Sequence, residues 1–279
     1  MRLHALALAA LALGTGGPLA AQEWRTLDVS RQLRDTTPLH VRVSYGSGKA
    51  ALRAVDSPAL YQMQLKYDAR RAEPVHVYDA EGRSLRLGVT QQSMRFSGNR
   101  DMDGAEMRLD LTRSVPLDLS LELGAVEADL DLSGLRLEAL KLETGASETR
   151  LRFDAPNTSR MRALDLQVGA ASFRGSRLAN ANADEVRVRG TVGEVELDFG
   201  GQWTRDVELH VEVTLGSVTV HVPADVGVRL ELDRFLSSFE HDGMTKRGGA
   251  WVSDNWETAR YHLRIKSRSA LGSFELDHR

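Results

Sequence analysis

Apolar and polar residues alternate along most of this chain, and the alternation shifts by one position at recurring glycines. In the stretch VEVTLGSVTVHVP, every second residue is apolar from Val211 to Leu215. The alternation then resumes one register later, from Val218 to Val222, with Gly216-Ser217 between the two runs. Because side chains along a strand point alternately to its two faces, the pattern predicts two strand segments that face one core across a turn.

Similar units follow one another from Met107 onward, for example LDLSLELGAVEADLDL and VRVRGTVGEVELDF. In most units the residue before the turn glycine is predicted to share the inward face with the residue three places further on, as with Leu215 and Val218. A degenerate unit carries Ser237-Ser238 in the turn position. The turn glycines are Gly124, Gly145, Gly169, Gly193, Gly216 and Gly272, and Gly46 stands at an earlier parity change.

Two architectures place both strand segments of such a unit on one core. One is a two-residue hairpin with glycine in the first central position. The other is a β-arc, in which the chain passes from one sheet of a solenoid to the facing sheet. The same side-chain types recur at the same offset about every 21–24 residues, as expected when coils stack and each one copies its neighbour. We therefore predict an all-β fold, a β-solenoid of two-strand coils over residues 114–279.

Before the repeats, residues 38–113 carry further short strand patterns and are predicted to form a smaller β domain. Residues 22–37 are polar and are interpreted as a linker or a cap. A long insertion at 240–258 interrupts the repeats. The first 21 residues, MRLHALALAALALGTGGPLAA, have the positive start, short apolar run and small residues of an export signal. A retained membrane anchor is the alternative.

The ordered succession of these motifs resembles the bacterial toast-rack family, which includes LiaF-like cell-wall-antibiotic-response proteins and putative adhesins. The carrying stretches are VPLDLSLELGAVEADLDLSGL, RFDAPNTSRMRALDLQVGAASF, VGEVELDFGGQW, LGSVTVHVPADVGVRL and SDNWETARYHLRIKSRSALGSFEL. Residues 38–89, with VSYGSGKAAL and AEPVHVYD, resemble the N-terminal toast-rack domain of that family. The resemblance implies a β-solenoid outside the cytoplasm, in the periplasm or at the cell surface. It implies no catalytic residues.

Composition narrows the chemistry. The net charge of −3 and the absence of a basic run give no reason to expect a nucleic-acid partner. The chain has no cysteine, so disulfides, thiol catalysis and zinc–cysteine sites are excluded. Histidines such as His210 and His221 stand at outward strand positions without a convincing ligand spacing, so neither metal nor cofactor is predicted. The many carboxylates also alternate outward, although stacking could still assemble a polysaccharide-active site.

Two tryptophans in the insertion, Trp251 and Trp256, are the candidate partner-binding residues, because exposed tryptophans stack on sugars or anchor proteins. Capping of the last coil is the competing interpretation. The sequence thus predicts an exported, non-enzymatic, adhesin-like or scaffold module that binds an envelope protein or glycan. The alternatives are a periplasmic accessory or sensor domain in envelope stress and, third, a polysaccharide-active enzyme.

Overall fold

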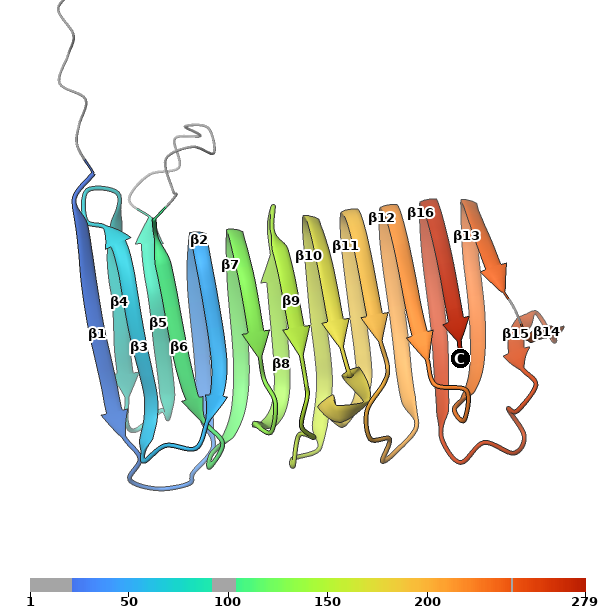
Figure 1. Ribbon diagram of the computed structural model, residues 1–279, viewed down its shortest axis with the longest axis horizontal. Helices are drawn as coiled ribbons and strands as arrows, with labels where there is room; N and C mark the ends of the chain where they lie inside the picture. The colour runs from blue at the N-terminus through green and yellow to red at the C-terminus, as the bar shows by residue number, and fades with distance from the viewer. Residues whose placement is uncertain (1–21, 92–103, 242) are drawn as a thin grey trace, which may run out of the picture.

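The computed structural model describes residues 22–91, 104–241 and 243–279, which form an all-β protein whose strands lie side by side in one long row (Figure 1). The export signal predicted for residues 1–21 lies outside the described residues. The strands of the first half are β1 (Trp24–Gln32), β2 (Leu39–Val55), β3 (Ala59–Asp68), β4 (Ala72–Asp79), β5 (Ser84–Gln91), β6 (Glu106–Thr112), β7 (Pro116–Asp131), β8 (Arg136–Thr144) and β9 (Glu148–Arg152). Those of the second half are β10 (Met161–Ser176), β11 (Ala183–Asp198), β12 (Val207–Val222), β13 (Gly227–His241), β14 (Met244–Arg247), β15 (Ala250–Ser253) and β16 (His262–His278), with a short 3-10 helix, η1 (Leu178–Ala181), after β10.

The long strands bend near their middle. In β7 the two halves pair with different neighbours, whereas β10 and β11 pair with each other over both halves. The first half of β7 pairs with β8 as far as Leu123, and the second half pairs with β9 from Glu127 onward. Figure 1 shows the long strands folding over along its upper side. We call this side the bend edge, marked by Gly48, Gly124, Gly193, Gly216 and Gly272, and the opposite side, where successive strands connect, the connection edge.

Successive long strands pair in parallel. Leu164 of β10 lies beside Val186 of β11, which in turn lies beside Leu209 of β12. A two-residue hairpin at each turn glycine would require antiparallel partners, but the partners are parallel. Most of the turn glycines lie inside continuous bent strands, namely Gly124, Gly169, Gly193, Gly216 and Gly272. Gly145 lies between β8 and β9, which both pair in parallel with β7. The hairpin alternative for the repeats is therefore wrong.

The parity shift of the sequence corresponds to a change in which residues are buried. In the first half of β12, Val211 and Val213 are buried, whereas in the second half the buried positions are those of Val218 and Val220. Both halves thus direct their apolar side chains into one core that extends through the described residues. Burial of these aliphatic side chains is the main stabilising contribution in a chain without disulfides.

The residue before the turn glycine does not always face inward. Leu123 and Val168 are buried, but Val192, Leu215 and Leu271 are 43%, 44% and 44% exposed. The inward prediction for these three is wrong. At Gly216 the backbone φ is +144°, and both Thr214 and Leu215 are turned to the outside before the second half begins.

The turn glycines also form two separate ladders rather than one. Gly193 pairs with Ala171, not with Gly169, and the ladder continues through Gly216 to Gly272. Stacking of all the turn glycines in a single line, as the repeat suggests, is therefore wrong by two residues between β10 and β11. The reason is that two successive strands need not bend at the same position to remain in register.

The order of the strands departs from the order of the sequence at the C-terminal end. β16, the last strand, lies between β12 and β13 and pairs in parallel with both. The insertion predicted at 240–258 contains the hairpin of β14 and β15, and β15 pairs with β13 as the row ends. Figure 1 shows this hairpin at the extreme right of the row.

At the N-terminal end, β1 forms an outer strand paired with β3, so part of the segment predicted as a linker or cap covers one end of the row. No break in pairing marks the predicted boundary at residues 113/114 within the part of the chain that the structure describes. β2 pairs in parallel with β7 from Leu39 to Arg53. The division into two domains at that point stays a prediction.

Buried asparagines join strands along the connection edge. The side chain of Asn157 is 3% exposed and accepts a hydrogen bond from the backbone N–H of Leu137. It donates to the carbonyl oxygens of Leu137 and Ala181. Asn180 extends the pattern by donating to Phe153 O and accepting from Gln202 N. These bonds satisfy backbone groups that the turns leave unpaired.

Candidate functional site

A groove of about 530 Å³ lies on the outer face of the three neighbouring strands β12, β16 and β13. The tip of the β14–β15 hairpin, at Gly248-Gly249 and Ala250, forms its remaining wall. The hairpin reaches this position because β15 pairs with the first half of β13. The groove therefore lies where β16, the last strand of the chain, is inserted between β12 and β13.

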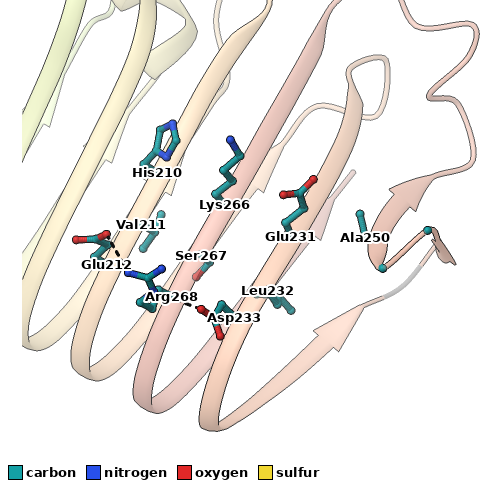
Figure 2. Close-up of a pocket in the computed structure, with 12 residues that line it drawn as sticks. His210, Val211, Glu212, Glu231, Leu232, Asp233, Ala250, Lys266, Ser267 and Arg268 are labelled. Carbon is teal, nitrogen blue, oxygen red and sulfur yellow. Dashed lines mark hydrogen bonds and ion pairs between the residues drawn. The ribbon is translucent and has the colours of Figure 1, made fainter.

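Charged side chains cross the groove in two rows (Figure 2). The outward positions alternate along each strand, and the parallel register aligns them across strands. His210, Lys266 and Glu231 form the first row. Glu212, Arg268 and Asp233 form the second row.

Arg268 is the central charge of the second row. Its Nη1 lies 3.8 Å from Glu212 Oε1, and its Nε lies 3.4 Å from Asp233 Oδ2. In the first row, His210 Nε2 lies 3.6 Å from Glu185 Oε1 and 3.6 Å from Glu208 Oε2, which extends the polar surface toward β11. The arrangement presents hydrogen-bond donors and acceptors side by side, with the charges of opposite sign close together.

This chemistry suits hydrogen bonding to a polar ligand better than metal binding. Within residues 22–91, 104–241 and 243–279, no group of three or more histidine, aspartate or glutamate side chains is placed to hold a metal ion. The groove residues likewise do not show a nucleophile held by a base, the pair that covalent catalysis needs.

The two predicted partner-binding tryptophans lie outside the lining of the groove. Trp251, on β15 next to Ala250, is half-buried against the core, with Lys246 Nζ 5.9 Å from its ring centroid. Its position agrees with the capping interpretation as well as with a binding role.

Trp256 belongs to a separate contact in the loop before β16. Its ring meets that of His262 edge-on, with 4.5 Å between centroids, and the guanidinium of Arg264 lies 5.7 Å from its centroid. Its carbonyl oxygen is 3.0 Å from His262 Nε2. Trp251 lies on β15 and Trp256 lies in the loop before β16, and their binding role stays a prediction.

The sequence does not predict the groove, because stacking in sequence order would not place β16 between β12 and β13. The sequence pattern predicts only a solvated strand histidine at His210 and does not single out the other charged residues of the groove, which are Lys266, Arg268, Glu231 and Asp233. Alternation marks all of them as outward positions, which was the available signal. The juxtaposition of β12, β16 and β13 is not encoded in that alternation.

The family of the protein follows from comparison with known sequences. Residues 20–174, more than half of the chain, match the family model for the N-terminal domain of toast_rack, a domain of unknown function. The chain therefore belongs to the toast-rack family. The matched segment ends within β10, well beyond the boundary predicted at residue 113.

Solved structures with a related arrangement include a putative cell adhesion protein from Clostridium sporogenes, with a TM-score of 0.48, 15% identity, and coverage of 91% of this chain and 100% of that chain. A putative adhesin from Bacteroides fragilis gives a TM-score of 0.43 and 10% identity, with coverage of 92% and 98%. A comparison with curated proteins finds no match. Among the described residues, no helix has the length and apolar character needed to cross a membrane.

Proposed function

We propose that this protein is an exported, non-enzymatic β-solenoid module of the cell envelope that binds a glycan in the groove over β12, β16 and β13. The parallel register of successive bent strands supports the solenoid interpretation. Membership of the toast-rack family and the export-signal pattern in residues 1–21 support a location outside the cytoplasm.

The observation that carries the proposal is the double row of paired charges in the groove. Sugar hydroxyl groups both donate and accept hydrogen bonds, so they fit a surface on which carboxylates and cationic groups alternate. Charge-assisted hydrogen bonds are stronger than neutral ones. The groove carries nearly equal numbers of negative and positive side chains, which favours an uncharged glycan over a strongly charged one. The negative side chains are Glu212, Glu231 and Asp233, and the positive ones are Lys266 and Arg268.

A binding role accounts for the carboxylates better than a hydrolytic one. Glycoside hydrolysis needs one carboxyl group that gives up a proton, typically one held in apolar surroundings. Glu212 and Asp233 both lie beside Arg268. The third carboxylate, Glu231, has its Oε1 3.3 Å from Nη2 of Arg229. None of the three is held alone in apolar surroundings. The groove therefore offers contacts for holding a ligand rather than an acid for cleaving it.

Titration calorimetry of the full chain with cello-, chito- and malto-hexaose tests the proposal. We expect at least one of these oligosaccharides to bind and the variant Lys266→Ala/Arg268→Ala to bind it at least about tenfold more weakly, since two charge-assisted bonds are lost. Arg150→Ala/Arg174→Ala is the matched control, because both arginines are also exposed and paired with glutamates but lie on β9 and the second half of β10.

Equal affinity of the two double variants would contradict the groove assignment. Absence of binding by any of the three oligosaccharides, together with capture of an envelope protein that Trp251→Ala/Trp256→Ala abolishes, would favour a protein partner held by the insertion. Measurable release of reducing sugar from the hexaoses would contradict the non-enzymatic assignment.

A further inference from the structure

Three large aliphatic side chains stand exposed in a line on the bend edge. Val192, Leu215 and Leu271 are 43%, 44% and 44% exposed. They lie on the adjacent strands β11, β12 and β16, where Val192 pairs with Leu215 and Leu215 pairs with Leu271. We call these three residues the aliphatic ridge. Neighbouring strands are about 4.8 Å apart, so the ridge is continuous.

The described positions that flank the two leucines of the ridge are uncharged, whereas Val192 has Glu194 nearby. On the second half of the strands, the outward position nearest the bend is Glu194 in β11 but Ser217 in β12 and Ser273 in β16. On the other flank Thr214 is exposed. Hydroxyl groups therefore border the two leucines, in contrast to the charged rows of the groove.

Small apolar side chains are exposed further along the bend edge, on the N-terminal side of the ridge. Ala170, which pairs with Val192, is exposed, and so is Ala125 at the bend of β7. Three half-exposed aliphatic side chains on a narrow edge are far short of the roughly 800 Å² that each partner contributes to a stable protein interface. A second copy of the chain is therefore a poor occupant.

The N-terminal segment reaches the same edge. The ring of Trp24 lies against Gly104, and the next residue, Ala105, contacts Gly48 at the bend of β2. Figure 1 shows β1 beginning on the side where the long strands fold over. In the sequence, Trp24 follows the apolar run of residues 5–13. Trp24 is half-buried against the core, and Lys66 Nζ lies 5.1 Å from its ring centroid. β1 lies at the other end of the row from the ridge, so Trp24 shares its edge but does not touch it. Tryptophan is enriched at membrane–water interfaces.

We propose that the bend edge docks on a lipid bilayer with uncharged headgroups, and that Val192, Leu215 and Leu271 enter its interfacial region. Apolar side chains gain from leaving water, while the serine and threonine flanks remain compatible with the headgroups. Docking in this orientation directs the connection edge away from the bilayer. The proposal is independent of the glycan groove, which lies on the outer face of the strands.

Site-specific labelling of the full chain tests the docking. Because the chain has no cysteine, a single introduced cysteine is the only site that a thiol-reactive label modifies. An environment-sensitive fluorophore is attached at Thr214→Cys on the bend edge or at Asp225→Cys, which is exposed on the connection edge. With phosphatidylcholine vesicles, we expect a blue shift of the emission for the label at position 214 and none for the label at position 225.

The variant Val192→Ser/Leu215→Ser/Leu271→Ser, carrying the label at position 214, is expected to need at least a tenfold higher lipid concentration for the same shift. Val77→Ser is the matched control, because Val77 is 43% exposed on β4, away from the bend edge. The thermal midpoints of both variants should equal that of the unsubstituted chain, since only exposed side chains change.

Three results would overturn the proposal. The first is an unshifted label at position 214, and the second is an equal response of the triple variant and the unsubstituted chain, which would leave residues 1–21 as the whole cause of vesicle binding. The third is a concentration-dependent dimer that the triple variant abolishes, because the ridge would then be a contact between copies. None of these results affects oligosaccharide binding in the groove.

Discussion

Single residues on the bend edge are constrained by the closeness of neighbouring backbones. A Cβ atom on Gly216 would lie 1.9 Å from the carbonyl oxygen of Gly193, and one on Gly272 would lie 1.8 Å from that of Gly216. A Cβ on Gly124 would lie 2.2 Å from Gly46 O, although φ at Gly124 is not in the left-handed region. Close approach therefore requires glycine in both ladders, and a positive φ adds to the requirement in only one of them.

For Gly216→Val we expect a loss of more than about 1 kcal/mol in the free energy of unfolding, because φ is +144° and the new Cβ meets backbone. Urea denaturation followed by circular dichroism measures it. Gly243→Asn is the control, since Gly243 also has a positive φ of +67° but nothing within 4 Å of the added Cβ. A cost for Gly216→Val no larger than that of the control would contradict the close-approach argument.

A buried tyrosine links stability to alkaline pH. Tyr45 is 2% exposed, and its hydroxyl has no hydrogen-bond partner among the described residues. Burial raises the pKa of Tyr45 above its ordinary value of 10.0, and Glu106 adds to this effect. The native state therefore keeps a proton that the unfolded state releases above about pH 10.

The pKa of Tyr45 is higher in the native state than in the unfolded state. The stability that this pKa difference confers is fully present below the pKa of the unfolded tyrosine and is lost as the pH rises above it. We expect the free energy of unfolding to fall between about pH 10 and 11, and Tyr45→Phe to reduce the slope. At neutral pH Tyr45→Phe should cost less than about 1 kcal/mol, because the hydroxyl makes no hydrogen bond to replace. An unchanged alkaline slope in Tyr45→Phe would show that Tyr45 ionises with little penalty when folded.

At the scale of elements, β16 connects the C-terminal hairpin to the rest of the molecule. β13 pairs with β16 and β15, and among the described strands it has no pairing with β12. Phe274 and Leu276 of β16 are buried in the common core. Removal of β16 would leave unpaired backbone groups on both sides of the gap.

We expect a chain ending at residue 261 to be cleaved first within residues 227–253, whereas β7, β10 and β11 resist proteolysis. Limited proteolysis with mass spectrometry identifies the sites, and the complete chain is the control. Continued protection of residues 227–253 would mean that β13 can move into the place of β16 beside β12, contrary to the element-level prediction.

At the scale of the whole molecule, each strand of the row depends on its two neighbours. Interior strands such as β10 and β11 are covered on both sides, whereas β1 at one end and β14 at the other have a single partner. In repeat-like architectures, stability is close to a sum of contributions from units and their contacts. Protection should therefore decrease from the centre of the row toward its ends.

Hydrogen exchange measured by mass spectrometry tests this expectation. Peptides from β10 and β11 should exchange slowest, those from β1 and β14 fastest, and those from β16 should resemble the interior despite being last in sequence. Fast exchange in β16, at the rate of the terminal strands, would contradict its position between β12 and β13. Uniform protection along the row would instead indicate one cooperative unit.

The sequence by itself determined the all-β class, the inward and outward positions of most strands, and the existence of a bend near Gly216. These follow from the two-residue period of a strand, which is local and can be seen in one chain. It also supported membership of the toast-rack family. It did not show that Gly193 pairs with Ala171 or that Leu215 faces outward, because bend positions depend on the neighbouring strand.

Only the tertiary structure decided which strands are neighbours. The alternation in HLRIKSRSALGSFEL is compatible with any place in the row, since it specifies a face and not a partner. In the folded chain β16 lies between β12 and β13 and pairs in parallel with both. The groove with Arg268 between Glu212 and Asp233 exists because of that placement. Pairing across long sequence separations is a property of the folded chain, which local periodicity does not contain.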